Sequence, residues 1–378
     1  MKCKIFERCG GCDFPHDDII EQKEYKNAYI KSLFKDIIIP KDIITMDNPY
    51  YYRNKSLRTF QKSGKNNILA GIYAKGSHKV VEVDDCLIEN EVSQKIFKTI
   101  EQIAKKYKME PYDEDSETGL LRHVLIRRGH NSKEVMVILV LANTYFTGKK
   151  NFVKLLVKKH PEITTIVVNY NKRKSSVVLE GRYETIYGPG FIYDTLLDLK
   201  FKISPSSFYQ VNSAQTEILY NKVIELGDFK KSDKVLDAYC GIGTIGMVVS
   251  KHVKEVIGVE NNEKAVKEAN INKKINDIEN INFITADATE YIVENYKEDF
   301  DKVIMDPPRA GFTNEFLEAL IKMAPEKIIY VSCNPDTLVR DLKVLASKYE
   351  VKEIQPVDMF PFTKHVETIS LIERIGIK

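Results

Sequence analysis

The chain predicts an α/β fold, with a mostly parallel, doubly wound sheet in its second half and a mixed, β-rich domain in its first half. From about residue 205 onward, short apolar runs alternate with longer amphipathic stretches such as Asn262–Ile275. Alternating strands and helices favour parallel strands with helices packed on both faces. The expected strands of the second half are Lys234–Asp237, Glu255–Glu260, Asn282–Ala286, Lys302–Met305, Lys327–Ser332 and His365–Ile372.

Apolar and β-branched runs mark the first half as β-rich. Its expected strands are Ile68–Tyr73, His78–Val83, Leu121–Arg128, Val135–Leu141 and Thr164–Asn169. The run Val135–Ala142 is far too short to span a bilayer, so it predicts a buried strand. We expect residues 1–90, 50–204 and 205–378 to form three regions, of which the first two overlap. Because no stretch of signal-peptide length opens the chain, we expect a cytoplasmic protein, and by default a monomer.

Positive charge is concentrated in the first half, although the whole chain carries a formal net charge of only +3. Residues 1–200 carry 34 Lys and Arg against 26 Asp and Glu, whereas residues 201–378 carry 23 against 28. A basic half suggests contact with a polyanion, although an ordinary solvated surface explains the imbalance equally well. Aromatic and basic residues are interleaved in Tyr50–Arg58, a pattern that suits bases stacked beside phosphates. The residues expected to extend this RNA surface are Arg122, His123, Arg127 and Arg128.

Four of the six cysteines form a candidate metal site in the first half. They are Cys3, Cys9, Cys12 and Cys86. In a reducing compartment, clustered cysteines more often bind metal than form disulfides. Four thiolates suit either zinc or an iron–sulfur cluster, and the spacing alone does not choose between them. The Gly-Gly pair before Cys12 avoids crowding a bulky group, which favours an iron–sulfur cluster.

A glycine-rich turn follows the first expected strand of the second half. Its glycines, Gly241, Gly243 and Gly246, let the backbone turn tightly and approach a ligand at the start of the next helix. This glycine pattern alone is also typical of a dinucleotide-binding site. Asp237 precedes the glycines at the end of the strand, where the cationic methionine moiety of S-adenosylmethionine could sit.

Two more acidic residues end the next two strands. Glu260 lies 23 residues after Asp237, placed to accept hydrogen bonds from a ribose diol, and Asp287 could meet an adenine amino group. A lone acid at such a position is usually a helix cap or a loop residue. Three acids at successive strand ends favour S-adenosylmethionine, and they argue against a dinucleotide-dependent oxidoreductase with an accessory cluster.

The fourth and fifth strands of this half lead into a candidate catalytic centre. Asp306-Pro307-Pro308 is followed by Arg309, and an arginine in place of an aromatic residue argues against an amine target. Cys333 ends the fifth strand at the carboxyl edge of the sheet, where open α/β folds bind ligands. Alone, such a cysteine is more often a small core residue. The Asp-Pro-Pro motif before it and Asn334-Pro335 after it favour a functional role.

A nucleophilic Cys333 suits methylation of carbon 5 of uracil, because that carbon is a poor nucleophile. Thiolate addition to carbon 6 turns the ring into an enolate, whose carbon 5 can attack a sulfonium methyl group. A free thiol has a pKa near ~8.5, so the site must lower that value or deprotonate Cys333 during attack. Glu367 begins the last strand and is the candidate base that later removes the carbon 5 proton.

Together these motifs resemble the RNA (uracil-5-)-methyltransferase family. The resemblance covers essentially the whole chain and rests on Ser204–Asn212, Gly241–Thr244, Asp306–Gly311, Ser332–Asp341 and Asp358–Glu367. It implies a class I methyltransferase (Rossmann-like) domain in the second half. It also implies a [4Fe–4S] cluster on the four cysteines, in a pattern that includes His16. One departure is Thr244, where several members have Asn.

The resemblance also assigns roles to single residues. It implies that Cys333 is the nucleophile, that Glu367 is the proton acceptor and that Phe208 lies near the flipped uracil. The implied contacts of the cofactor are Gln210, Tyr239, Glu260, Asp287 and Asp306. For Cys240, also often a cysteine in the family, we expect packing and not catalysis.

The RNA substrate is less well defined. Family members often carry an N-terminal RNA-binding barrel, the TRAM domain, which we expect to be missing because the cysteine motif starts at residue 3. This short form resembles the ribosomal enzymes more than the transfer RNA enzyme of enterobacteria, which lacks the cluster. We expect 23S ribosomal RNA as the substrate, with transfer RNA as the alternative. A nonenzymatic iron–sulfur RNA-binding protein is the alternative from another class, and Cys333 and Glu367 argue against it.

Overall fold

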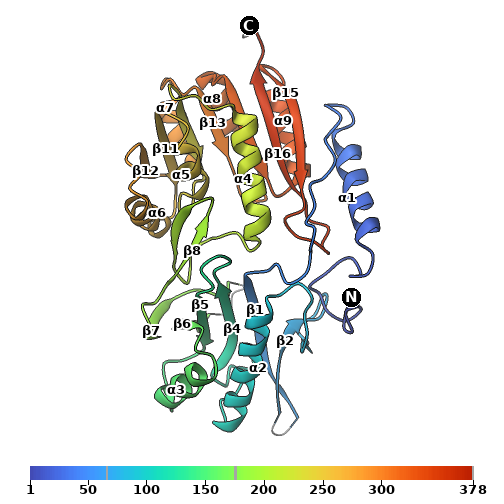
Figure 1. Cartoon of the computed structure of the whole chain (residues 1–378), viewed down its shortest axis with the longest axis vertical. Coiled ribbons are helices and arrows are strands. Elements are labelled where there is room, and N and C mark those ends of the chain that lie inside the picture. Colours follow the sequence, from blue (N-terminus) through green and yellow to red (C-terminus); the bar gives the residue numbers. More distant parts are fainter. Residues whose placement is uncertain (65–66, 174–176, 377–378) are drawn as a thin grey trace.

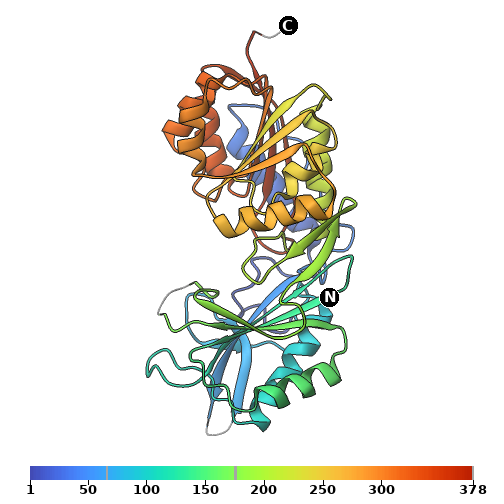
Figure 2. The same ribbon diagram turned by 90° about the vertical axis from the view of Figure 1, so that its left-hand side faces the viewer.

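Two lobes are stacked along the long axis of the molecule, and each is built around a seven-stranded sheet (Figures 1 and 2). The computed structural model describes residues 1–64, 67–173 and 177–376. Residues 55–187 supply the strands of the first sheet, and residues 234–374 supply those of the second. None of the helices in the described part of the chain combines the length and apolar character that a membrane span requires.

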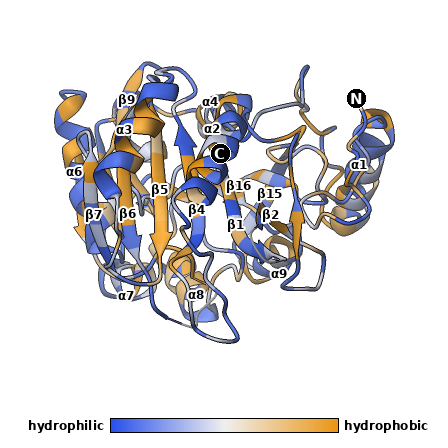
Figure 3. Ribbon diagram, turned by 90° about the horizontal axis from the view of Figure 1, so that it is seen from below, coloured by the Kyte–Doolittle hydropathy of each residue, from blue (hydrophilic) through white to orange (hydrophobic). Residues whose placement is uncertain are grey.

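The first sheet has the strand order β3-β2-β1-β4-β5-β6-β7, in which β5 and β6 run parallel and the other neighbours run antiparallel. Its strands are β1 (Lys55–Ser63), β2 (Asn67–Tyr73), β3 (Val80–Glu82), β4 (Leu121–Arg128), β5 (Val135–Leu141), β6 (Ile163–Tyr170) and β7 (Arg182–Tyr187). Helices α2 (Glu91–Lys106) and α3 (Lys149–Lys159) pack on one face. Every residue of β5 is buried, as its apolar sequence predicts, and Figure 3 shows this strand between β4 and β6.

The second sheet has the strand order β12-β11-β10-β13-β14-β16-β15, and β16 runs antiparallel to both of its neighbours. Its strands are β10 (Lys234–Ala238), β11 (Glu255–Glu260), β12 (Ile281–Thr285), β13 (Lys302–Met305), β14 (Lys327–Ser332), β15 (Tyr349–Val357) and β16 (Glu367–Arg374). On one face lie α4 (Ser213–Gly227), α5 (Thr244–Ser250) and α6 (Glu263–Ile275). On the other lie α1 (Ile19–Phe34), α7 (Ala288–Asn295), α8 (Asn314–Met323) and α9 (Pro335–Leu345).

The strands expected from the sequence are confirmed, with boundaries that differ by no more than two residues. The sequence did not predict β15, nor β1, β7 and the two strands within residues 192–203. The first residues of β15 are partly exposed and charged, including Glu350, Lys352 and Glu353, so they hide the apolar residues that follow. The result is a parallel sheet with an antiparallel hairpin, β15 and β16, at one edge.

The N-terminal segment packs on the second sheet, although it is remote from that sheet in sequence. Ile30 and Phe34 of α1 are buried in the same apolar core as α8 and α9. Further on, the Ile44 amide donates to the Pro356 carbonyl of β15 at 3.0 Å. Figure 1 shows α1 beside the β15–β16 hairpin. Cys9 pairs with Ala74 of the first lobe, so the chain starts beside that lobe, packs α1 on the second lobe and returns to the first lobe at β1.

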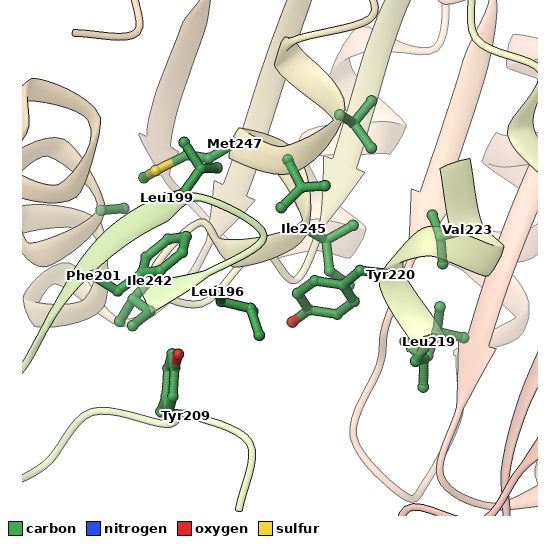
Figure 4. Packing of buried hydrophobic residues seen from close by; sticks show 14 of the residues in the cluster. Leu196, Leu199, Phe201, Tyr209, Leu219, Tyr220, Val223, Ile242, Ile245 and Met247 are labelled. Atoms are coloured by element: carbon green, nitrogen blue, oxygen red, sulfur yellow. The ribbon is translucent and has the colours of Figure 1, made fainter. Parts of the chain in front are cut away.

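A two-stranded ribbon links the lobes. It consists of β8 (Ile192–Leu196) and β9 (Leu199–Ile203). Leu196 and Phe201 of this ribbon share an apolar cluster with Tyr220 of α4, as Figure 4 shows. The same cluster includes residues of β5, so one continuous core fixes the first lobe against the second.

Replacing Lys26 by methionine tests the ion pair that ties α1 to the second lobe. The Lys26 ammonium lies 2.7 Å from the Asp358 carboxylate, and both side chains are buried. An unpaired buried carboxylate is costly, so we expect the free energy of unfolding to fall by roughly 3–5 kcal/mol, measured by urea denaturation. The double variant Lys26→Met/Asp358→Leu should recover most of the loss. A loss of about 1 kcal/mol or less, as for a surface pair, would contradict this account.

Candidate active site

Cys333 and Glu367 lie opposite each other at one edge of the second sheet. Cys333 follows the last residue of β14, and Glu367 is the first residue of β16. In this antiparallel pair Ser332 is the partner of Thr368, so Cys333 meets Glu367 one step further along the ladder. The structure therefore brings together the two residues that the sequence predicts as nucleophile and base.

Asp306 completes this edge of the sheet. It follows β13, which runs parallel beside β14 with Met305 paired to Tyr330. The residue as a whole is partly exposed, but its carboxyl group lies deep enough that burial raises its pKa to about 7. Parallel strands end at the same edge, which explains why the Asp-Pro-Pro motif and the cysteine converge.

The acidic groups of this edge influence one another. Burial raises the pKa of Glu367 to about 8, with a further increase from Asp306 and an opposing effect of Arg309. Burial also raises the pKa of the Cys333 thiol to about 11, with smaller contributions from Glu367 and Asp306, while Arg309 lowers it. Because like charges in a dehydrated site disfavour ionisation, a bound cation would stabilise the charged forms.

A pocket of about 320 Å³ opens in front of Cys333. Its walls include the rings of Tyr25 and Tyr29 on α1 and the cationic side chains of Arg309 and Lys364. Across the part of the chain that the structure describes, no carboxylate is within ion-pair distance of either cation. The two tyrosines were not predicted as site residues, because the buried face of α1 includes Gln22 and Lys26 and its sequence carries no clear amphipathic pattern.

The glycine-rich turn lines a second cleft beside this edge. Tyr239 and Gly243 both have positive φ, at +65° and +83°, so the chain turns sharply between β10 and α5. Gln210, Tyr239 and Asp306, three of the predicted cofactor contacts, line the cleft. Thr244 also lines it, and its hydroxyl lies 2.8 Å from that of Tyr220.

Asp237 shows that this cleft suits a cationic ligand. Its side chain is buried, and neither carboxylate oxygen meets the geometry of a hydrogen bond with any described residue. Burial and the nearby Asp306 raise its pKa to about 8, and the Gly246 backbone offsets part of that shift. A buried carboxylate without a partner is unfavourable unless a cation binds to it. The ammonium and sulfonium groups of S-adenosylmethionine fit this requirement.

Glu260 and Asp287 lie at the ends of the next two strands, as predicted. Glu260 ends β11, and its carboxylate accepts hydrogen bonds from the amides of Gly241 at 3.1 Å and Asn262 at 2.8 Å. Asp287 caps α7 and accepts from the amide of Thr289 at 2.8 Å. Both acids therefore also stabilise the turns that they occupy.

The loop that carries Gln210 is held from behind by the first lobe. Arg127 of β4 donates to the Ser207 and Pro205 carbonyls, and the Ser207 hydroxyl donates to Glu268 at 2.7 Å. Phe208 projects outward and is 71% exposed at the rim of the cofactor cleft. Cys240 is buried within the turn and also lines the cleft.

The predicted RNA surface of the first lobe is largely wrong. Arg122, His123 and Arg127 are buried, so they cannot offer charge to a phosphate. Arg122 donates to the Asn171 and Arg173 carbonyls, each at 3.0 Å. In the aromatic and basic run, Tyr52 and Arg58 are also buried. The buried arginines form hydrogen bonds and ion pairs with carbonyl and carboxylate groups inside the protein. Of the four strand residues predicted to extend this surface, Arg128 is the one that stays partly exposed.

The four cysteines of the first half line one pocket of about 410 Å³. They are Cys3, Cys9, Cys12 and Cys86. Across residues 1–64, 67–173 and 177–376, no three His, Cys, Asp or Glu side chains are grouped closely enough to hold a metal ion. Burial raises the pKa of Cys12, and the neighbouring thiols add to the shift. His16 lies beside them, with its Nε2 atom 3.6 Å from the Cys12 sulfur.

Comparison with known proteins identifies the family. A family model described as tRNA (Uracil-5-)-methyltransferase matches residues 191–375. An uncharacterized RNA methyltransferase of Halalkalibacterium halodurans is 36% identical over 98% of this chain and 82% of its own length. One of Clostridium tetani is 38% identical over 100% of this chain and 83% of its own. The chain belongs to the tRNA (uracil-5-)-methyltransferase family.

A solved structure agrees with this assignment. The Pyrococcus abyssi tRNA (uracil-54, C5)-methyltransferase in complex with S-adenosyl-L-homocysteine superposes with a TM-score of 0.79 and 29% identity, covering 93% of this chain and 83% of its own. The chain is thus an S-adenosylmethionine-dependent RNA (uracil-5-)-methyltransferase with a mixed α/β methyltransferase fold. The family predicted from the motifs is confirmed.

Asp237 should make stability and cofactor binding of this methyltransferase depend on pH. Its ordinary pKa is 3.8 and its pKa in the folded, ligand-free protein is about 8. Between these values the folded state keeps a proton that the unfolded state has released, so stability should fall as pH rises through that window. Affinity for S-adenosylhomocysteine should rise over the same window, because its ammonium group favours the charged carboxylate.

Calorimetric titration of S-adenosylhomocysteine below and above pH 8 measures this effect. Asp237→Asn should weaken binding by roughly 10- to 100-fold, because it removes a bond to a charged group, and it should flatten the pH dependence. The exposed Asp299 provides the matched control, Asp299→Asn, which should bind as the wild type does. Equal affinities for Asp237→Asn and the control would contradict the account.

Proposed function

We propose that this methyltransferase transfers a methyl group to carbon 5 of a specific uridine in 23S ribosomal RNA. The observation that carries the proposal is the strand pairing that sets Cys333 opposite Glu367, at the edge that also bears Asp306. Methylation at carbon 5 requires a nucleophile for carbon 6 and a separate base for the carbon 5 proton. A thiol and a carboxylate at one sheet edge meet that requirement.

Cys333 is the proposed nucleophile. Its sulfur forms a bond to carbon 6, and the electrons of the 5,6 double bond move to give an enolate. Carbon 5 then takes the electrophilic methyl group that S-adenosylmethionine supplies. Because the pKa of Cys333 is raised to about 11, its thiol must pass its proton to water in the open pocket in front of it as the bond forms. Arg309 lowers that pKa and is the cation placed to stabilise the thiolate.

Glu367 is the proposed base. It takes the proton from carbon 5, the 5,6 double bond forms again, and the bond between carbon 6 and the Cys333 sulfur breaks. Its pKa of about 8 makes the Glu367 carboxylate a stronger base than an exposed glutamate, and the positive charge of bound S-adenosylmethionine would favour the ionised form that accepts the proton. Burial also shields the carboxylate from solvent, which keeps the proton transfer inside the site.

The proposed contacts of the cofactor are Gln210, Tyr239, Glu260, Asp287 and Asp306. Three of them line the cleft beside the glycine-rich turn. The other two, Glu260 and Asp287, end neighbouring strands of the same sheet edge, in the order that methionine, ribose and adenine moieties require. The unpartnered Asp237 supplies negative charge at the methionine end.

RNA is proposed to enter through the pocket in front of Cys333. Tyr25 and Tyr29 offer rings for base stacking, and Arg309 and Lys364 offer cations for phosphates. The exposed ring of Phe208 can cover the target base at the rim of the cofactor cleft. A base must leave its stack to reach the partly exposed thiol at the base of this pocket, so a looped or single-stranded target fits better than a duplex.

Two RNA substrates compete in this proposal. The four-cysteine motif favours ribosomal RNA, because chains with this motif resemble the ribosomal enzymes of the family. The likeness to an archaeal tRNA (uracil-54, C5)-methyltransferase favours transfer RNA as the second candidate. The pocket in front of Cys333 accepts a single-stranded segment of either RNA.

We also propose that the cysteine pocket holds a [4Fe–4S] cluster. Four thiols converge on one cavity of about 410 Å³, and a cluster spreads its ligands around a body larger than one ion. The Nδ1 atom of His16 is buried without a hydrogen-bond partner in the described part of the chain, so this wall of the pocket offers an unused polar group. The four cysteines would hold the cluster. Its role would be structural, and it would supply no redox chemistry to methyl transfer.

A methylation assay tests the reaction and the substrate together. The protein is incubated with labelled S-adenosylmethionine and transcripts of 23S ribosomal or transfer RNA, and the labelled nucleoside is identified by mass spectrometry. We expect 5-methyluridine in the 23S transcript and none with Cys333→Ala, which should still bind the cofactor. The exposed Ser347, remote from the site, provides the control, Ser347→Ala. Normal turnover by Cys333→Ala would refute the mechanism. Methylation of transfer RNA alone would mean that transfer RNA, and not 23S ribosomal RNA, is the substrate.

Replacing Glu367 by glutamine separates the addition of the Cys333 sulfur to carbon 6 from its later elimination. The amide cannot accept the carbon 5 proton, so the bond between Cys333 and the RNA should persist and a covalent protein–RNA complex should accumulate on denaturing gels. Turnover should fall by roughly 100-fold or more, the usual contribution of a general base. Loss of cofactor affinity without any adduct would mean that Glu367 has a different role.

The cluster proposal predicts the composition of the purified protein. Protein prepared without oxygen should contain iron and inorganic sulfide and should absorb visible light. Cys12→Ser should lose most of the iron and sulfide, whereas Cys240→Ala, outside the pocket, should retain them. A colourless wild-type protein that contains zinc instead would show that the four cysteines bind a different metal.

A further inference from the structure

The connection between β15 and β16 decides where Glu367 lies. We call these residues, Asp358–Val366, the base loop, because Glu367 follows them directly. Phe362 at the centre of the loop is fully buried and has a φ of +68°. An aromatic residue keeps this conformation only where its surroundings impose it. The base loop therefore depends on contacts from outside itself.

Most of these contacts come from residues 13–26 at the other end of the chain. The Phe362 carbonyl accepts hydrogen bonds from the amides of Asp13 at 2.8 Å and Phe14 at 3.1 Å, and the Phe362 amide donates to the Gln22 side chain. The Asp13 carboxylate accepts from the Lys364 amide at 3.1 Å. The backbone around the strained residue is thus held on both sides.

Lys26 fixes the beginning of the base loop. Its ammonium forms the buried ion pair with Asp358 and donates to the Phe360 carbonyl at 3.2 Å. From α4 and the residue before it, Gln215 and Asn212 donate to the carbonyls of Asp358 and Met359. The beginning of the loop therefore has two supports. The Phe362 amide and carbonyl both bond to the N-terminal segment, while its ring also stacks on Tyr50 and packs with Tyr52.

The same segment is continuous with the cysteine pocket. Cys12 directly precedes Asp13, and Cys12 and Cys86 both pack against the small apolar cluster that contains Phe362. The His16 ring lies 4.4 Å from the Phe362 ring, between centroids. Phe362 thus contacts the wall of the cysteine pocket on one side and belongs to the loop before Glu367 on the other.

We propose that residues 13–26 are a positioning element for Glu367 and that the integrity of the cysteine pocket controls it. The proposal rests on the role of Glu367 in the proposed function. A closed pocket fixes Cys12 and Cys86, which hold Asp13 and Phe362 and so orient the carboxylate toward the carbon 5 proton. An opened pocket releases the centre of the base loop. Proton removal is then lost, while the cofactor cleft, built on β10, α5 and the Gln210 loop, still binds its ligand.

The variant Gln22→Met tests the positioning element. It keeps a side chain of similar length but removes the acceptor for the Phe362 amide. We expect kcat to fall roughly 10- to 100-fold, as for a displaced catalytic group, with KM for S-adenosylmethionine unchanged and the covalent RNA adduct accumulating. Gln102 on α2 provides the matched control, Gln102→Met. Loss of activity in Gln22→Met with a raised KM and no adduct would overturn the proposal.

Hydrogen–deuterium exchange of Cys12→Ser tests the link to the pocket without using activity. Peptides that cover the base loop should exchange at least several-fold faster than in the wild type, while peptides of α5 should be unchanged. Unchanged exchange in the base loop would overturn the link. Faster exchange throughout the chain would also overturn it, because the effect would be global unfolding. If the wild-type protein transferred no methyl group, only the proposed function would be refuted, because hydrogen–deuterium exchange of the base loop does not depend on the reaction.

Discussion

The buried contact between the N-terminal segment and the base loop is the constraint on which the active site depends. Lys26 and Asp358 are separated by 332 residues, yet they form an ion pair with almost no exposure to solvent. The ion pair compensates for the loss of hydration only if both partners are held in place. The surrounding hydrogen bonds to Phe362 supply that order, and Glu367 follows a few residues later.

A second feature of the site is its dehydrated negative charge. Asp237, Asp306 and Glu367 are all carboxyl groups whose pKa burial raises, to about 8, about 7 and about 8. The same environment serves two purposes. It gives Asp237 and Asp306 a strong preference for a cationic ligand, and it makes Glu367 basic enough to take a proton near neutral pH. Arg309 balances part of this charge beside Cys333.

Much of the fold and the catalytic edge could be predicted from the sequence. Parallel strands place their final residues at one edge, which positions Asp306 and Cys333, and an antiparallel last strand brings its first residue, Glu367, to the same edge. The packing of α1 could not be predicted, because its buried face combines Gln22 and Lys26 with Ile30 and Phe34 and shows no clear apolar periodicity. The prediction of an RNA surface on the first lobe was largely wrong because burial of single cations could not be predicted either. A cation in a strand, such as Arg127, can face solvent or buried carbonyls, and the sequence does not distinguish the two.

Trapping with transcripts that contain 5-fluorouridine tests the central claim most directly. Fluorine at carbon 5 cannot be removed as a proton, so elimination stops after methyl transfer. The account predicts a stable complex whose mass equals protein, RNA and one methyl group, with the RNA attached at Cys333 in the digested peptide. An adduct on another residue, or none with the cofactor bound and Cys333 unmodified, would contradict covalent catalysis by this thiol.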